Sequence, residues 1–255
     1  MNNFAEWVET RNKNWSNPTG FLSVTSINWL NEEPQTFKDV SGKWWALGHE
    51  VYADGFEGQG EQHWTVKVRD EFTVPMTGGV LEIASRGGQI VLRPRHTDSP
   101  ALKAFKGVSV FEYDPSYAVV AELIEDDRNI GVSSSAGDLG VTYDSPGKLV
   151  FELRGEHVEL TAFTRPDPSQ LWVIFRDGSS GKTTYGTGRS VTARKREDGK
   201  WDIDFNLSAN FPCSYTDFAT CPMAPRENHL SVVIEAGEKT PEFRHTLEGV
   251  VPQGY

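Results

Sequence analysis

After residue 20, the apolar residues of this 255-residue chain recur at every second position and seldom return to helical spacing. Residues 65–69 (TVKVR) and 80–84 (VLEIA) show the alternation, with glycine and proline near their borders. A period of two places successive side chains on opposite faces of a β-strand. The chain is therefore expected to be mainly β.

The first 15 residues follow a helical period instead. The side chains that would share one helix face are Phe4, Trp7, Val8, Arg11 and Trp15. Residues 17–20 (NPTG) end the pattern with amino acids typical of turns. One amphipathic helix is expected at the N-terminus.

The C-terminal half predicts antiparallel strands. Residues 148–153 and 156–163 form a hairpin around a two-residue turn, Arg154-Gly155. That turn pairs Phe151 with Val158 and Leu149 with Leu160. Further strand patterns cover residues 117–125, 171–175, 190–206 and 230–234. An antiparallel barrel or sandwich would close such a set.

A second hairpin can be read in two registers. A two-residue turn at Asp198-Gly199 mixes buried and solvated residues on one face, so we prefer a three-residue turn, 197–199, with Gly199 left-handed. This turn pairs Val191 with Phe205, Ala193 with Ile203 and Arg194 with Asp202. It directs Trp201, Ile203 and Phe205 into the core and leaves Asp202, Asp204 and Asn206 on the other face.

Residues 207–229 show neither period and contain both cysteines and three prolines. Loops of this length are usually functional or disordered, so this loop is the expected place for a site. Residues 131–140, rich in serine and glycine, are interpreted as an ordinary mobile connection.

Composition excludes several classes of function. The net charge of -11 and the pI near 5.0 oppose binding to nucleic acid or to an anionic membrane. No apolar run is long enough to span a membrane, and the N-terminus lacks the regions of a signal peptide. With only two cysteines, a soluble cytoplasmic protein is expected. The oligomeric state has no signal in the sequence.

No residue set forms a catalytic, metal or cofactor signature in its expected context. Gly181-Lys182-Thr183 follows a strand, but Arg176 stands where a phosphate-binding loop needs its first glycine. A β-turn is the preferred interpretation, because Asp-Gly and Ser-Gly are turn dipeptides.

Seven residues separate Cys213 from Cys221, which lies outside the usual spacing of zinc ligands. Buried structural thiols are the preferred interpretation of the pair, followed by a disulfide, a reactive thiol and a metal ligand.

Polar residues converge in sequence order on the long loop. Arg176 and Arg189 could clamp an anionic ligand beside Asp204, with Tyr185 and Asn206 nearby. The alternative is that the arginines form ion pairs with Asp177 and Asp204. For Asp202, a solvated pair with Arg194 is preferred to a catalytic carboxylate pair.

Four stretches together resemble a bacterial family known only as domain of unknown function 1684. They are residues 99–107, residues 175–189, residues 204–206 with 212–216, and residues 219–222 continuing through Glu227-Asn228 to 236–239. The resemblance extends over residues 21–239 and implies that the long loop is the hallmark of the family, adding Cys213, Tyr215, Glu227 and Asn228 to the candidate ligand-binding residues. It implies no activity, substrate or cofactor.

The N-terminal part of this family often resembles a forkhead-associated sandwich, a phosphopeptide-binding fold. Residues 35–44 lack the Gly-Ser pair and the following asparagine of that fold, so phosphopeptide binding is not expected.

We therefore expect an N-terminal helix (residues 1–20), a β sandwich-like region (21–114) and a C-terminal antiparallel β domain (115–255). The leading hypothesis is binding of a small polar or anionic ligand at the 207–229 loop. The alternatives are a hydrolase or transferase that uses Asp204 or Cys213, and a structural or interaction protein.

Overall fold

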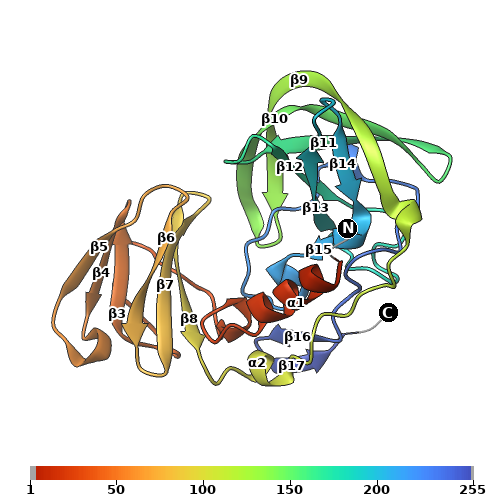
Figure 1. The fold of residues 1–255 in the computed structure, drawn as a ribbon. Helices are drawn as coiled ribbons and strands as arrows, with labels where there is room; N and C mark the ends of the chain where they lie inside the picture. The colour runs from red at the N-terminus through yellow and green to blue at the C-terminus, as the bar shows by residue number, and fades with distance from the viewer. Residues whose placement is uncertain (1–3, 254–255) are drawn as a thin grey trace.

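The computed structural model describes residues 4–253 (Figure 1). Strands contain 49% of the residues and helices 14%. Figure 1 shows a sandwich of strands beside a barrel, with a helix and a short hairpin below the barrel. The predicted fold class is confirmed. The outermost residues of the predicted first and third segments, 1–3 and 254–255, lie outside the described residues.

The predicted N-terminal helix is confirmed as α1 (Phe4–Trp15). Its buried Trp15 packs on Tyr215, with ring centroids 4.4 Å apart. Arg11 forms an ion pair with the buried Glu238 at 2.5 Å. The helix therefore packs against residues of the C-terminal region.

Two four-stranded antiparallel sheets form the sandwich. The first has the order β1 (Asn28–Trp29), β8 (Gln89–His96), β7 (Gly79–Arg86) and β6 (Glu71–Met76). The second has the order β2 (Gln35–Phe37), β3 (Val40–Leu47), β4 (Glu50–Asp54) and β5 (Gln62–Thr65). One apolar core that includes Trp44, Val51 and Ile83 joins them. The predicted strand at residues 65–69 is wrong beyond its first residue, because β5 ends at Thr65 and Arg69 has a left-handed φ of 62°.

The central strands β7 and β8 of the first sheet are buried on both faces. In β7, residues 81–85 are all buried, although alternate side chains point to opposite faces. One face covers the sandwich core, and the other turns toward the barrel region. Arg69 donates a hydrogen bond to the Thr142 carbonyl at 3.1 Å, and a Cβ added to Gly87 would lie 2.5 Å from Leu139. The sandwich and the barrel therefore pack directly against each other at this end.

The barrel has six antiparallel strands. Their order is β12 (Gln170–Phe175), β11 (Glu156–Thr164), β10 (Gly137–Leu153), β9 (Ala118–Ser134), β14 (Trp201–Asp204) and β13 (Arg189–Lys195). Pairing of β12 with β13 closes the barrel, and β15 (Ala209–Asn210) adds to β13. Phe175, Val173 and Leu149 are among the fully buried side chains of the interior.

Both predicted hairpin registers occur. Phe151 lies opposite Val158, and Leu149 lies opposite Leu160. The three-residue turn pairs Ala193 with Ile203 and Arg194 with Asp202, and Gly199 is left-handed with φ of 83°.

The second hairpin differs from the prediction at its end. β14 stops at Asp204, and Phe205 begins a 3-10 turn instead of pairing with Val191. Asn206 does not share a solvated face with Asp202, because the turn buries it completely. Asp202 forms its ion pair with Arg196 at 2.8 Å rather than with Arg194.

Two further predictions are wrong. Residues 131–140 are the paired ends of β9 and β10 and their turn, with Val132 opposite Val141. Residues 230–234 form no strand. Their backbone instead meets the segment after β12, where Gly178 donates to the Val232 carbonyl at 2.8 Å.

A small layer lies below the barrel (Figure 1). It contains α2 (Pro100–Ala104) and the hairpin of β16 (Phe243–Thr246) and β17 (Gly249–Pro252). Trp15, Leu22, Ala101 and Tyr215 form its buried core. The short 3-10 turns of the chain are η1 (Phe21–Ser23), η2 (Phe56–Gly58), η3 (Pro115–Tyr117), η4 (Phe205–Leu207), η5 (Pro212–Ser214) and η6 (Arg226–Asn228).

Candidate functional site

The long loop, residues 207–229, is ordered by side chains that bond to the backbone. Asn228 is fully buried, and its amide oxygen accepts from Thr161 N at 2.8 Å. Its amide nitrogen donates to the carbonyls of Thr161 (2.9 Å) and Ile174 (2.8 Å). Buried backbone groups without partners are costly, so Asn228 fastens the loop to β11 and β12.

Asp204 and Asn206 form a similar tie at the start of the loop. The Asp204 carboxylate accepts from the Asn206 backbone at 3.0 Å and from its side chain at 2.8 Å. The Asn206 side-chain oxygen accepts from the Asp114 backbone N–H at 3.0 Å, and the Asn206 side-chain nitrogen donates to the Asp114 carbonyl at 2.8 Å. These groups hold η3 against η4.

Arg189 lies inside the barrel region, where 1% of the residue is exposed. Its guanidinium pairs with Asp177 at 3.0 Å and donates to the carbonyls of Ile234, Ala236 and Glu238. Burial lowers the pKa of Arg189, although Asp177 opposes that effect. The guanidinium thus holds the irregular segment 234–238 against the barrel.

Arg176 and Glu227 lie near Asn228. The backbone N–H of Arg176 donates to the Asn228 carbonyl at 3.0 Å. The Glu227 carboxylate accepts from the Thr161 hydroxyl at 2.5 Å and lies 3.6 Å from Arg128.

Tyr185 and Cys213 are in direct contact on another side of the loop. The Tyr185 hydroxyl donates to the Cys213 carbonyl at 2.7 Å and accepts from Arg244 at 2.9 Å. Burial raises the pKa of Tyr185. Tyr215 belongs to the layer below the barrel, where burial raises its pKa.

The nine predicted residues therefore form several separate groups. Tyr185 with Cys213, Asp204 with Asn206, and Arg176 with Asn228 and Glu227 are local neighbours. Arg189 and Tyr215 lie in different parts of the interior. Their role as one ligand site stays a prediction.

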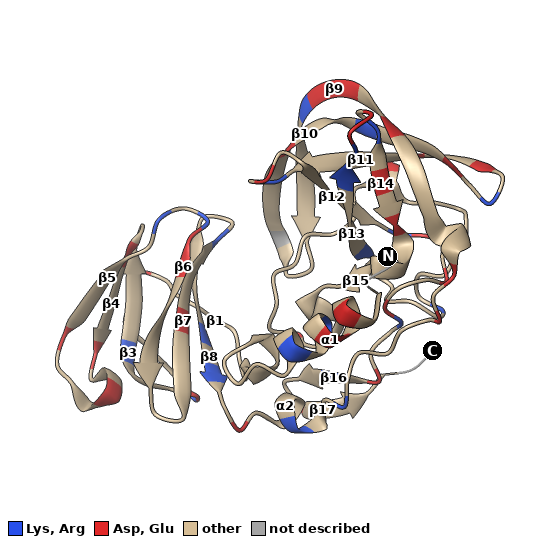
Figure 2. Cartoon of the chain, viewed as in Figure 1, with Lys and Arg blue, Asp and Glu red and all other residues tan. Residues whose placement is uncertain are grey.

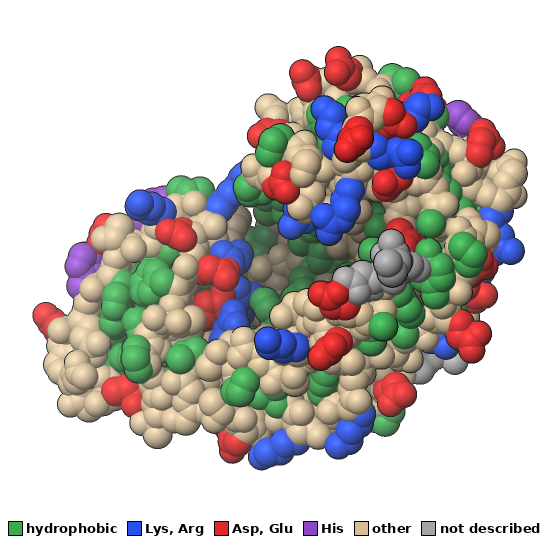
Figure 3. Space-filling view, in the orientation of Figure 1, with side chains coloured by type: hydrophobic (Ala, Val, Ile, Leu, Met, Phe, Trp, Pro, Cys, Tyr) green, Lys and Arg blue, Asp and Glu red, His purple; other side chains and the backbone are tan. Residues whose placement is uncertain are grey.

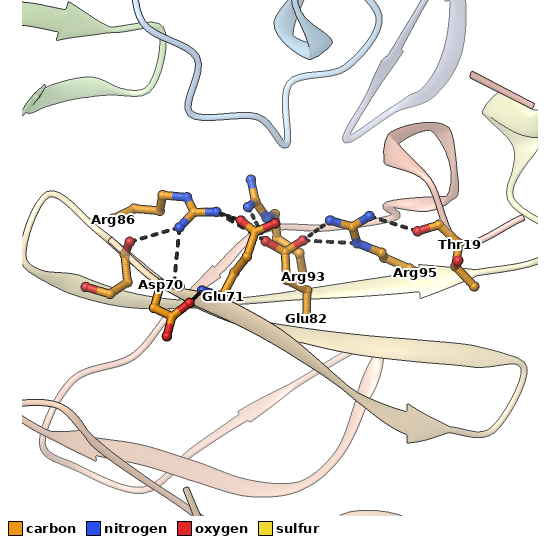
Figure 4. Close-up of polar contacts among 8 residues, drawn as sticks. Thr19, Asp70, Glu71, Glu82, Arg86, Arg93 and Arg95 are labelled. Carbon is orange, nitrogen blue, oxygen red and sulfur yellow. Dashed lines mark hydrogen bonds and ion pairs between the residues drawn. The ribbon is translucent and has the colours of Figure 1, made fainter. Parts of the chain in front are cut away.

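A cluster outside that set has the chemistry of a binding site. We define the arginine cluster as Glu82 and Arg86 of β7 with Arg93 and Arg95 of β8. Figure 4 shows these side chains leaving the same face of the sheet, toward loops of the C-terminal region. The Glu82 side chain is 1% exposed and pairs with Arg93 through one oxygen and with Arg95 through the other. Arg86 lies 3.6 Å from Glu82 and also pairs with Glu71.

Positive charge exceeds negative charge in this cluster. Three guanidinium groups share one buried carboxylate; among the described residues Arg86 also pairs with Glu71, and the charge of Asp70 acts on it as well. Burial and the charges of Arg93 and Arg95 lower the pKa of Arg86 to about 10. Within residues 4–253, the buried Arg93 Nε has no hydrogen-bond partner.

Phe21 connects the arginine cluster to the long loop. The guanidinium carbons of Arg93 and Arg95 lie 5.0 and 5.3 Å from the centre of its ring. The same ring packs against the buried cluster that contains Cys213 and Cys221 at the loop, and Phe211 packs against that cluster too. Cation–π contact and apolar packing thus join the two regions through one side chain.

A hollow lies between the sandwich and the barrel. Figure 3 shows hydrophobic side chains deep inside it, with basic and acidic side chains along its sandwich wall. Figure 2 likewise places basic segments on β8, whereas the outer curve of β9 is mainly acidic. The hollow therefore has a locally basic wall although the whole chain carries a charge of -11.

Three aromatic side chains of the barrel region pack against one buried cluster, and we define them as the aromatic wall: Tyr143, Trp172 and Phe211. All three are partly exposed. Ring centroids are 5.6 Å apart for Tyr143 and Trp172 and 5.8 Å for Trp172 and Phe211. Burial raises the pKa of Tyr143, and its hydroxyl is close enough to Arg86 for their charges to interact.

The sequence contains a signal for the arginine cluster. Gly87-Gly88 is a two-residue hairpin turn, and extending its register places Glu82 opposite Arg93. Arg95 lies two residues beyond Arg93 and therefore on the same face. The sequence does not indicate that the ring of Phe21 packs against this face.

The described residues contain neither a cluster of metal ligands nor a helix that could span a membrane. Within residues 4–253, no three His, Cys, Asp or Glu side chains are arranged to hold a metal ion. The helices described there are too short and too polar to cross a membrane.

Comparison with known proteins identifies a family without an assigned activity. No curated protein matches the chain. A solution NMR structure of an uncharacterized protein from Haloarcula marismortui is 33% identical, with a TM-score of 0.45. That match covers 56% of this chain and 83% of the other.

Residues 103–239 match the family model described as "Protein of unknown function (DUF1684)". The matched segment contains the barrel and the long loop but not the arginine cluster, so the resemblance over residues 21–102 stays a prediction. The match covers more than half of the 255 residues, and the chain belongs to the DUF1684 family.

Proposed function

We propose that the protein binds a small organic anion in the hollow between the sandwich and the barrel. The proposal retains the class of ligand expected from the sequence and places its charged group at the arginine cluster. The long loop contributes Phe211 to the opposite wall.

The observation that carries the proposal is that Arg93 and Arg95 share the single carboxylate of Glu82. The Arg86 and Arg95 side chains are 21% and 12% exposed, whereas Arg93 is buried beneath them. A carboxylate or phosphate in the hollow would accept hydrogen bonds from Arg86 and Arg95 and offset the excess positive charge. Arginine is suited to this role because its planar fork matches both groups.

The aromatic wall supports an organic anion over an inorganic one. Tyr143 and Phe211 mark the two ends of this wall, near Arg86 and Phe21 respectively. A ligand with an apolar body would lie against these rings while its charged group meets the arginines. Ligand sites commonly combine apolar walls with a few placed polar groups.

Isothermal titration of the full chain with benzoate tests the proposal, with acetate as the ligand that lacks the apolar body. Benzoate should bind more tightly than acetate. Arg86→Gln should weaken benzoate binding roughly tenfold or more, since a hydrogen bond to a charged group contributes about 1.5–3 kcal/mol.

Arg196→Gln is the matched control. Arg196 is an exposed arginine on the β13–β14 hairpin and also pairs with a carboxylate, that of Asp202. Its replacement should leave the affinity unchanged. Absence of benzoate binding, or equal effects of the two arginine replacements, would contradict the proposal.

A further inference from the structure

Cys213 and Cys221 lie against each other in the long loop. The Cys213 backbone N–H donates to Cys221 Sγ at 3.3 Å, and both side chains belong to the same buried cluster. Both are free thiols, and the exposed fraction is 2% for Cys213 and 6% for Cys221. The fold thus supplies the proximity that a disulfide requires.

The surroundings distinguish the two sulfurs. The hydrogen bond from Cys221 lowers the pKa of Cys213, and Ser135, Arg244 and Tyr185 act in the same direction against burial. The hydrogen bond between the thiols and burial raise the pKa of Cys221. The thiolate is the nucleophile, so Cys213 is suited to attack an oxidant. Cys221 is suited to react afterwards with the oxidised Cys213 sulfur.

Each cysteine is anchored to a different part of the fold. Arg244 of β16 donates to the Cys213 carbonyl at 2.5 Å. Cys221 is fastened to the β9–β10 turn, because its N–H donates to the Ser135 hydroxyl at 3.0 Å and its carbonyl accepts from Ser135 N at 2.8 Å. A covalent bond between the sulfurs would join these two anchors.

We propose that Cys213 and Cys221 form a redox-active dithiol, which a hydroperoxide oxidises to a disulfide within the loop. The Cys213 thiolate attacks the terminal peroxide oxygen and the O–O bond breaks. The leaving alkoxide, or hydroxide in the case of hydrogen peroxide, takes up the proton that the Cys213 thiol has lost and forms an alcohol or water. The Cys221 sulfur then attacks the resulting sulfenic acid at sulfur. The S–O bond breaks, and the hydroxyl leaves as water with the Cys221 proton. The two thiols lose two electrons in total, and the peroxide is reduced.

Intact mass and thiol titration of the reduced full chain treated with hydrogen peroxide test this proposal. The expected product has lost both thiols and about 2 Da, and dithiothreitol restores it. Cys221→Ser should stop at a sulfenic acid that dimedone captures. Cys213→Ser should lose its remaining thiol roughly tenfold more slowly, because the activated sulfur is gone.

The wild-type measurement stands even if a serine variant fails to fold. Retention of both thiols, or a disulfide that forms only in urea, would overturn the proposal. Equal peroxide reactivity of the two folded serine variants would overturn the assigned roles of the two sulfurs. None of these outcomes depends on anion binding in the hollow.

Discussion

Replacement of Glu82 by glutamine removes the carboxylate that the three arginines of the cluster share. Glutamine keeps the shape of the side chain but places an NH₂ donor among guanidinium donors. Removal of one partner from a buried ion pair costs roughly 3–5 kcal/mol, because the other charge is left uncompensated. The Glu82 side chain is 1% exposed, so we expect Glu82→Gln to lower the free energy of unfolding by about that amount.

The stability of the Glu82→Gln variant should increase when phosphate is added. Phosphate can replace the missing acceptor, and a ligand at a hundred times its Kd stabilises a protein by about 2.7 kcal/mol. Urea unfolding followed by tryptophan fluorescence, in phosphate and in chloride at equal ionic strength, measures both effects. Glu122→Gln is the control, because Glu122 pairs with Lys200 on the exposed surface.

Two results would refute this reasoning. Glu82→Gln would be as stable as the wild type if the buried guanidinium groups did not depend on the Glu82 carboxylate for compensation. Equal stabilisation by chloride and phosphate would show that screening, rather than a bound anion, restores stability.

Three further changes test the architecture. Asn228→Ala leaves three buried backbone groups of β11 and β12 without hydrogen-bond partners. We expect this change to lower the free energy of unfolding, measured by urea titration, by about 3 kcal/mol or more. Gly87→Ala should destabilise more than Gly88→Ala in thermal unfolding: both glycines have positive φ, but only the added Cβ at Gly87 meets Leu139. Burial lowers the pKa of His245, so protonation favours the unfolded chain and stability falls as the pH drops below the ordinary histidine value. His245→Gln should reduce this loss in urea titrations between about pH 7 and pH 5.

Local patterns predicted the strands that neighbour each other in sequence. The Arg154-Gly155 and 197–199 turns set their registers through turn length and alternation, which are properties of a few residues. Prediction failed where tertiary packing decides. Residues 230–234 have a strand pattern, yet their backbone bonds to the loop after β12 and to the buried Arg189.

The candidate site was harder to predict for the same reason. Asn206 and Asn228 have the polarity of binding residues, but the loop buries them to satisfy its own backbone. Glu82 and Arg93 lie opposite each other in a hairpin that alternation predicts. Arg93 packs against Phe21, which is distant in sequence, so the importance of the pair follows only from the folded chain.

A crystal of the full chain soaked with 4-bromobenzoate tests the central claim most directly, because bromine gives an anomalous signal that locates the ligand. The account predicts a bromine peak beside Tyr143 and Trp172, with the carboxylate at hydrogen-bond distance from the Arg86 and Arg95 guanidinium groups. A ligand bound elsewhere, or an empty hollow at a concentration that saturates binding in solution, would contradict it.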